Sequence, residues 1–156
     1  MDKGVKIVES VLDDVYELAP HLRQDDINEV QALGFKPEQS LLQGFIYSDT
    51  CYSAKYQGKT IGMFGATNYN LPDKWGSVWF LGSDETMKFP VAFIKEGKKL
   101  LKQAFQKYDI LVNAVDSRNT SHIRYIEHIG LIISNPIMIN GYKFLQFYGI
   151  KNNKEK

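Results

Sequence analysis

The N-terminal third of the chain changes early from alternating to helical spacing of its apolar residues. Residues 5–8 alternate as a short strand does, and from residue 12 to residue 22 apolar side chains recur every three or four positions. We expect two further helices, over residues 25–33 and 37–45, because acidic residues and proline favour the first turn of a helix. Gly34 is expected to end the first of these two helices.

The middle of the chain takes the period of two that is typical of strands. We expect strands over residues 51–56, 60–68 and 75–81. Gln57 and Gly58 predict a tight turn between the first two strands. Gly62 and Gly65, inside the second strand, predict a bend or a close approach of another backbone.

The C-terminal half begins with the strongest amphipathic helix, which starts at Pro90. Its apolar face comprises Phe93, Gly97, Leu100, Leu101, Ala104, Phe105 and Tyr108. A buried strand is expected over residues 110–115, followed by a helix that Asn119 or Thr120 caps. The order closes with a strand broken at Asn135-Pro136, an Asn140-Gly141 turn and a strand over residues 142–148.

The resulting order is a strand, helices, three strands, a helix, a strand, a helix and a hairpin. It predicts an α/β fold with a mixed sheet (α+β), as one domain over residues 1–150 with a polar tail over 151–156. The 19 Lys and Arg nearly balance the 18 Asp and Glu, so neither a nucleic acid nor a membrane is an expected partner. Cys51 is the only cysteine, which excludes an internal disulfide and favours a soluble protein in a reducing, intracellular compartment.

The predicted order resembles the fold of the GCN5-related N-acetyltransferases (GNAT) over essentially the whole domain. Residues 119–131, NTSHIRYIEHIGL, are similar to the segment of that family in which an asparagine opens a helix that ends at a glycine. Together with Trp79-Phe80 and Ser83-Asp84, this segment also resembles a narrower family. That family is the internal virion and acetyltransferase-like proteins of short-tailed (podovirus-type) bacteriophages, and the resemblance implies a role in the virion or in its assembly.

The GNAT resemblance implies acetyl-CoA as the cofactor, with its pyrophosphate held by a glycine-rich loop before the long helix. The matching positions here are Ala92, Lys95 and Gly97, so only the last glycine is kept. Pro90 indicates that the helix has already begun at this point. The remaining candidates for cofactor binding are Phe80, Leu81, Gly82, Lys95, Gly97 and Asn119.

Many GNAT enzymes place a tyrosine in the later helix, where it protonates the thiolate of CoA. The matching position here is Ile126, and the adjacent Tyr125 is rotated by about 100° around the helix. The candidates for catalysis are therefore Tyr125, a water held by Ser83, and His122 as a general base. The alternative for His122 is a histidine that bonds local backbone or packs against the sheet.

Several other polar residues have both a structural and a functional interpretation. Arg124 either binds a carboxylate or phosphate or lies on a solvated helix face. Asp25 and Asp26 are interpreted as charges at a helix start, and Asn119 as a helix cap. The three histidines, at positions 21, 122 and 128, lack metal-ligand spacing, so no metal site is expected.

Two hypotheses follow for the function. The first is a GNAT-fold phage protein without acetyltransferase activity or cofactor, which acts in the virion or its assembly through contacts with other virion proteins. The second is an acetyl-CoA-dependent N-acetyltransferase with a diverged pyrophosphate loop. The expected location is the virion interior or the host cytoplasm, and the sequence leaves the oligomeric state and the acceptor open.

Overall fold

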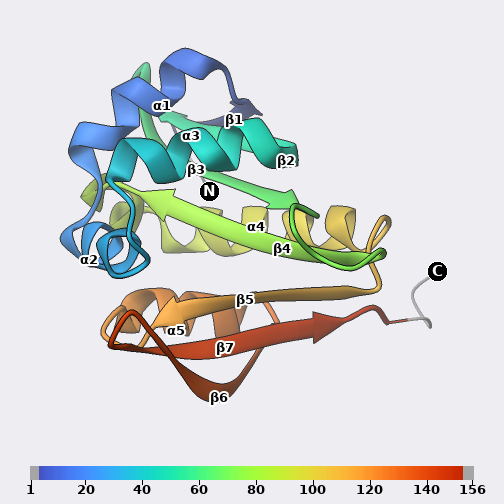
Figure 1. The fold of residues 1–156 in the computed structure, drawn as a ribbon. Coiled ribbons are helices and arrows are strands. Elements are labelled where there is room, and N and C mark those ends of the chain that lie inside the picture. The colour runs from blue at the N-terminus through green and yellow to red at the C-terminus, as the bar shows by residue number, and fades with distance from the viewer. Residues whose placement is uncertain (1–3, 153–156) are drawn as a thin grey trace.

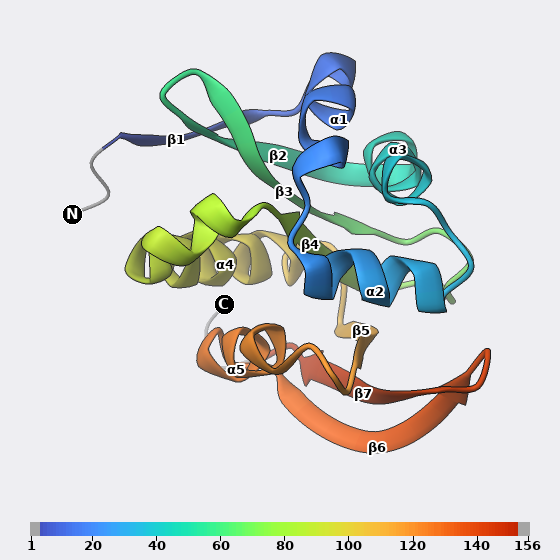
Figure 2. The ribbon, with the colours of Figure 1, turned by 90° about the vertical axis from the view of Figure 1, so that its left-hand side faces the viewer.

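The structure is a computed structural model that describes residues 4–152, and it contains one mixed sheet covered by helices on both faces (Figures 1 and 2). The strands are β1 (Val5–Glu9), β2 (Ser48–Tyr56), β3 (Lys59–Thr67), β4 (Trp75–Gly82), β5 (Ile110–Asp116), β6 (Ile132–Ile139) and β7 (Tyr142–Ile150). The α-helices are α1 (Leu12–Leu18), α2 (Gln24–Ala32), α3 (Pro37–Tyr47), α4 (Pro90–Ala104) and α5 (Thr120–His128). Two 3₁₀ helices are η1 (Ala19–His21) and η2 (Asp84–Lys88).

The seven strands lie in the order β1-β2-β3-β4-β5-β7-β6. Every neighbouring pair is antiparallel except β4 and β5, which run parallel. This arrangement confirms the predicted element order and the mixed sheet. Within the described residues no helix is both long enough and apolar enough to cross a bilayer.

The core has one layer on each side of the sheet. Helices α1 to α3 lie on one face, and α4 and α5 on the other (Figures 1 and 2). Met63 and Phe64 are consecutive in β3 and both are buried, but Met63 packs with α1 and α3 whereas Phe64 packs with α4 and α5. Because successive side chains of a strand point to opposite faces, the apolar residues 61–66 of β3 supply both layers.

The parallel pair β4 and β5 is short, and this shapes the centre of the molecule. Its registered pairs are Trp75 with Ile110 and Gly76 with Leu111. Beyond them the two strands diverge (Figure 1), with one side-chain link from Asn113 Nδ2 to the carbonyl oxygen of Val78 at 2.8 Å. The sheet is therefore open between the C-terminal ends of β4 and β5.

The predicted turns and the close backbone approach are confirmed. Gln57 and Asn140 have φ values of 51°, and each is followed by a glycine that also has positive φ, as a type I′ hairpin turn requires. A Cβ atom on Gly65 would lie 2.4 Å from the carbonyl oxygen of Thr50, so that position accepts only glycine.

Two of the differences from the predicted element boundaries have a local cause that involves proline. The first helix ends at Leu18 and not near residue 22, because Pro20 lies in the next turn and tightens it into η1. The strand broken at Pro136 is one strand, β6, with a register shift between Ile133 and Pro136. Proline is accepted there because β6 is an edge strand. A residue without an N–H can stand in an edge strand where no neighbouring strand needs that hydrogen bond.

Candidate functional site

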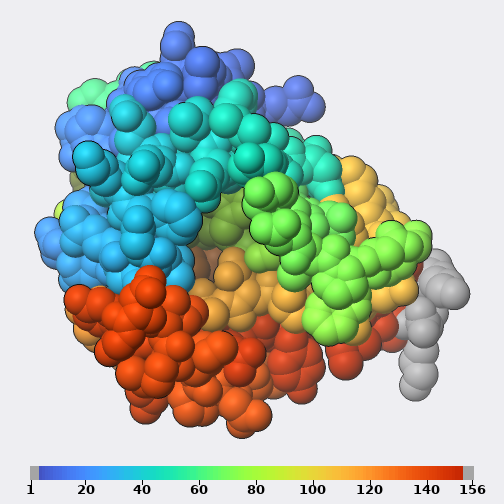
Figure 3. Space-filling model, in the orientation of Figure 1, coloured from blue at the N-terminus to red at the C-terminus, as the bar shows by residue number. Residues whose placement is uncertain are grey.

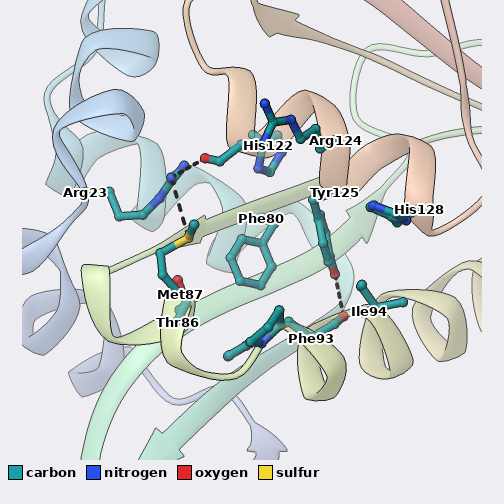
Figure 4. Close-up of a pocket in the computed structure, with 12 residues that line it drawn as sticks. Arg23, Phe80, Thr86, Met87, Phe93, Ile94, His122, Arg124, Tyr125 and His128 are labelled. Atoms are coloured by element: carbon teal, nitrogen blue, oxygen red, sulfur yellow. Dashed lines mark hydrogen bonds between the residues drawn. The ribbon is translucent and has the colours of Figure 1, made fainter.

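A pocket of about 280 Å³ opens between the end of β4, η2, the first turn of α4 and α5 (Figure 4). We name it the α4–α5 pocket. Most of its wall is apolar and comes from Phe80, Met87, Pro90, Phe93, Ile94 and Tyr125. An apolar concavity of this kind with a few polar groups around it is the usual form of a binding site.

The polar groups of the α4–α5 pocket are mostly basic. Arg23, His122, Arg124 and His128 line it, and none of the described lining residues is an acid. Arg124 is exposed and has no ion pair or hydrogen bond with any residue of the range 4–152. The pocket therefore presents an unpaired guanidinium beside an apolar wall.

Arg23 reaches the pocket from the chain segment just before α2. It is buried, and its guanidinium donates from Nη2 to Asp26 Oδ1 at 2.8 Å and to Asn119 Oδ1 at 3.0 Å. Its other nitrogen, Nη1, donates to Ser121 Oγ at 2.7 Å. These bonds hold the N-terminal end of α5 against the start of α2.

Asp26 connects this network to the end of β4. Its Oδ1 also accepts a hydrogen bond from Asn119 Nδ2 at 3.0 Å, and its Oδ2 accepts one from the backbone N–H of Gly82 at 3.0 Å. The carbonyl oxygen of Gly82 in turn accepts a bond from the backbone N–H of Arg23. Both backbone polar groups of Gly82 are therefore occupied within the chain.

The interpretation of Asp26 as a charge at a helix start is confirmed, whereas that of Asn119 needs correction. Asp26 lies in the first turn of α2, and because it is 1% exposed it serves as a buried acceptor as well. Asn119 precedes α5 at the capping position, but its side chain makes no capping bond. The reason is that its amide bonds to Arg23, Asp26 and Glu29, which lie far away in the sequence.

Glu29 lies one helical turn after Asp26 and completes the network. Its Oε1 accepts hydrogen bonds from the backbone N–H of Asp116 at 2.9 Å and from Asn119 Nδ2 at 3.4 Å. Burial raises the pKa of Glu29 to about 8, and the nearby Asp26 and Asp116 charges add to this shift. Asp116 differs because its ion pair with Arg118, at 2.6 Å, lowers its pKa.

Tyr125 and His122 lie side by side in the wall of the pocket. The Tyr125 hydroxyl donates to the carbonyl oxygen of Phe93 at 2.8 Å, which joins α5 to α4 (Figure 4). The His122 ring packs against both Phe80 and Tyr125, with centroid distances of 6.2 and 5.9 Å. Burial raises the pKa of Tyr125 and lowers the pKa of His122, so both rings favour their neutral forms.

Ser83 is separated from the other two candidates for catalysis. It borders a different pocket, of about 570 Å³, between the β2–β3 turn, the end of α1 and η2. Its Oγ is buried and has no hydrogen-bond partner among the described residues. The structure brings Tyr125 and His122 together with Phe80 and leaves Ser83 outside this group.

The remaining candidates for cofactor binding lie in packed or exposed positions. Gly97 is buried inside α4, and a Cβ atom there would lie 2.3 Å from the Tyr125 hydroxyl. Lys95 is exposed on the same helix. Leu81 is buried in the core layer under α1 and α3. Of the six candidates, Phe80 alone lines the α4–α5 pocket.

A further cleft, of about 440 Å³, lies where β4 and β5 diverge. It is on the face of the sheet opposite to the α4–α5 pocket. Figure 3 shows it as a hollow between α2, the loop after β3 and β5. Phe80 and His122 line both this cleft and the α4–α5 pocket. These two side chains therefore form the wall between cavities on the two faces of the sheet.

Sequence reasoning missed Arg23, Asp26 and Glu29 as parts of the site. The one available signal was the spacing of Arg23 and Asp26, since residues three apart on a helix are neighbours. Their main partners (Gly82, Asp116 and Asn119) lie at or after the ends of β4 and β5, far away in the sequence. No local pattern indicates such contacts. Among residues 4–152 there is no group of His, Cys, Asp or Glu side chains that could hold a metal ion.

Comparison with known sequences links the chain to a phage protein. The family model described as Bacteriophage T7, probable scaffold protein Gp13, matches residues 67–137. A curated relative, the probable scaffold protein gp13 of Escherichia phage T7, is 28% identical over 120 residues. The match covers 74% of this chain and 78% of that protein.

Comparison with solved structures identifies the fold. The GNAT-family acetyltransferase from Bacillus anthracis superimposes with a TM-score of 0.72 at 11% identity, with 97% of each chain covered. The aminoglycoside acetyltransferase AAC(6')-Ib in complex with ribostamycin and coenzyme A gives 0.69 at 12% identity, over 99% of this chain and 97% of that one. These likenesses show that the chain has the GNAT fold, as predicted from its element order.

Proposed function

We propose that the protein takes part in assembling a phage particle through protein–protein contacts and transfers no acetyl group. The observation that carries this proposal is the sequence similarity over 120 residues to the probable scaffold protein gp13 of Escherichia phage T7. The GNAT fold by itself does not decide the function, because one fold hosts many activities. The expected location is the particle or the host cell in which it is assembled.

The residues near the start of α4 do not fit a pyrophosphate cradle, which supports a role without acetyl-CoA. Such a cradle needs several free backbone N–H groups and no side chain in the way. Here η2 occupies residues 84–88, and α4 starts at Pro90, which has no N–H to offer. The remaining glycine, Gly97, lies inside the helix under Tyr125.

The bonding of Gly82 and Tyr125 supports the same conclusion. Gly82, at the end of β4, already uses its N–H and its carbonyl oxygen in bonds with Asp26 and Arg23. The Tyr125 hydroxyl already donates its proton in a hydrogen bond to the carbonyl oxygen of Phe93. A proton donor for a thiolate must be free to face that thiolate, and this hydroxyl faces α4.

An acetyl-CoA-dependent N-acetyltransferase is the second candidate function. It is favoured by the fold and by the pair of cavities that meet at Phe80 and His122, since transfer between two substrates needs access from two sides. The neutral His122 at that junction would suit a general base. Solved GNAT structures in complex with coenzyme A and with acetyl-CoA show which ligands to test.

Titration with acetyl-CoA and CoA, followed by thermal unfolding and calorimetry, separates the two candidates. A ligand at 100 times its dissociation constant adds about 2.7 kcal/mol to the free energy of unfolding. We expect no saturable shift with either ligand. A saturable shift of the unfolding temperature, with one ligand bound per chain, would favour the transferase over the assembly protein.

Deletion of the gene from the phage that encodes the chain tests the assembly role directly. We expect fewer infectious particles from the deletion strain and the protein itself in assembling or finished particles. Normal particle yield and infectivity, together with absence of the protein from purified particles and assembly intermediates, would exclude the assembly role.

A further inference from the structure

We infer that the α4–α5 pocket is a docking site for an apolar side chain of a partner protein, in a segment that carries carboxylates beside that side chain. The inference rests on the proposed assembly function and adds the place and the chemistry of the contact. It assigns the α4–α5 pocket to a peptide instead of a cofactor.

The shape of the pocket fits the insertion of a single side chain from outside. Its inner end is closed by the hydrogen bond from Tyr125 to the Phe93 carbonyl oxygen and by the Phe80 ring. The volume of about 280 Å³ has room for an aromatic or aliphatic side chain, which would bury against the apolar wall.

The apolar surface continues outside the pocket, as a peptide contact requires. Met87, at its edge, is 55% exposed, and Val91, in the first turn of α4, is 70% exposed. Exposed apolar side chains around an apolar concavity mark a contact surface more often than isolated ones do. The residues next to the anchoring side chain would cover Met87 and Val91.

The charges around the pocket determine which residues of the partner can lie next to its anchoring side chain. Arg23 is already paired with Asp26, but Arg124 is exposed and has no partner within residues 4–152. Two acids act on the pocket wall, and both are paired: Asp26 with Arg23, and Glu96 with Lys99. Because a guanidinium binds a carboxylate through two parallel hydrogen bonds, Arg124 favours Asp or Glu in the partner.

The partner is a protein and not a phosphate-bearing ligand because the pocket offers one free guanidinium and few free N–H groups. A nucleotide-like ligand needs several donors for its phosphates, and the chain carries a net charge of only +1. Burial lowers the pKa of His122, which favours its neutral form, so this lining residue does not add a second positive charge.

An array of overlapping peptides that covers the structural proteins of the encoding phage tests this inference. The full-length chain is the probe, with or without an excess of acetyl-CoA. We expect bound peptides to share an aromatic or aliphatic residue next to Asp or Glu, and binding to weaken as salt rises because the Arg124 charge is exposed. Acetyl-CoA should not compete.

Two variants locate the contact, and one controls for charge. Arg124→Glu reverses the free charge and should weaken binding of the selected peptides about tenfold or more. Val91→Asp adds a carboxylate to exposed apolar surface next to Pro90, which lines the pocket; the N-terminal end of α4 tolerates this charge, and binding should weaken similarly. Lys98→Glu makes the same charge change as Arg124→Glu on exposed α4 surface outside the pocket and should leave binding unchanged.

The results separate this inference from the proposed function. No bound peptides, bound peptides without acids, or equal binding by Arg124→Glu and Lys98→Glu would overturn the docking site. Competition by acetyl-CoA would replace it with a cofactor site. If the Arg124→Glu chain still enters particles and supports a normal yield, the docking site is wrong while the assembly role stands. If the wild-type chain neither enters particles nor affects their yield, the assembly role itself is wrong.

Discussion

The Tyr125 hydroxyl donates a hydrogen bond of 2.8 Å to the carbonyl oxygen of Phe93 and so joins α5 to α4 across the inner end of the pocket. This bond uses the second lone pair of a carbonyl oxygen that lies inside a helix. It fixes the distance between the two helices on this face of the sheet. The same bond occupies the one tyrosine hydroxyl that lines the pocket.

Removing this hydroxyl should cost measurable stability. Tyr125→Phe keeps the ring in its contacts with Phe80 and His122 and removes only the bond to Phe93. We expect the free energy of unfolding to fall by about 1 kcal/mol, which corresponds to a shift of the unfolding temperature of about 3 °C. Tyr16→Phe is the matched control, since Tyr16 is 47% exposed. Equal unfolding midpoints for the two variants would show that the bond contributes nothing.

Gly97 should be needed for packing against that same tyrosine. A Cβ atom at Gly97 would lie 2.3 Å from the Tyr125 hydroxyl and 2.8 Å from Ile129 Cγ2. Overpacking costs about 1 to 3 kcal/mol, while the better helix propensity of alanine returns about 1 kcal/mol. We therefore expect Gly97→Ala to destabilise the protein by about 1 kcal/mol.

A double-mutant cycle checks the physical reason for the Gly97 effect. In a Tyr125→Phe background the closest atom is gone, so Gly97→Ala should cost less than it does in the wild-type chain. Chemical denaturation of the four proteins measures the coupling. Additive changes would show that the glycine is required for a reason other than the Tyr125 contact.

Asp26 and Asp25 should respond very differently to the same substitution. In Asp26→Asn the new amide group must face either the Gly82 N–H or the donors of Arg23 and Asn119, all of which need an acceptor. The buried Arg23 also loses its counter-charge, and we expect a loss of about 2 to 4 kcal/mol. Asp25→Asn, at the neighbouring position, should change the free energy of unfolding by less than about 0.5 kcal/mol. Similar losses for both variants would contradict the buried network.

Glu29 should make the protein less stable as the pH rises. Its pKa is about 8 in the folded protein and about 4.5 in the unfolded chain, so between these values the folded state holds a proton that the unfolded state has lost. The contribution of Glu29 to stability is therefore complete below pH 4.5 and is lost progressively up to about pH 8.

The variant Glu29→Gln isolates this dependence on pH. Its amide oxygen can still accept from the Asp116 N–H, and it carries no charge to bury. We expect the variant to gain stability relative to the wild type as the pH rises from 5 to 8, measured by urea denaturation at several pH values. A constant difference between the two proteins over this range would mean that Glu29 titrates normally.

Local sequence determined the order of the elements and the turns between them. The hairpins at Gln57-Gly58 and Asn140-Gly141 follow from the positive φ that these residues adopt at little cost. The helix from Pro90 and its apolar face followed from spacing alone. Such features depend on neighbours a few residues away, and so the element order and the GNAT fold were predictable.

Tertiary structure alone decided which side chains form the site. Asn119 bonds to Asp26, 93 positions earlier in the chain, instead of capping its own helix. Ser83 and Tyr125 were predicted as alternatives for one role, but they border different pockets. The direction of a polar side chain depends on which distant donors and acceptors the packed sheet brings within hydrogen-bonding distance, and that information is not contained in any local stretch of sequence.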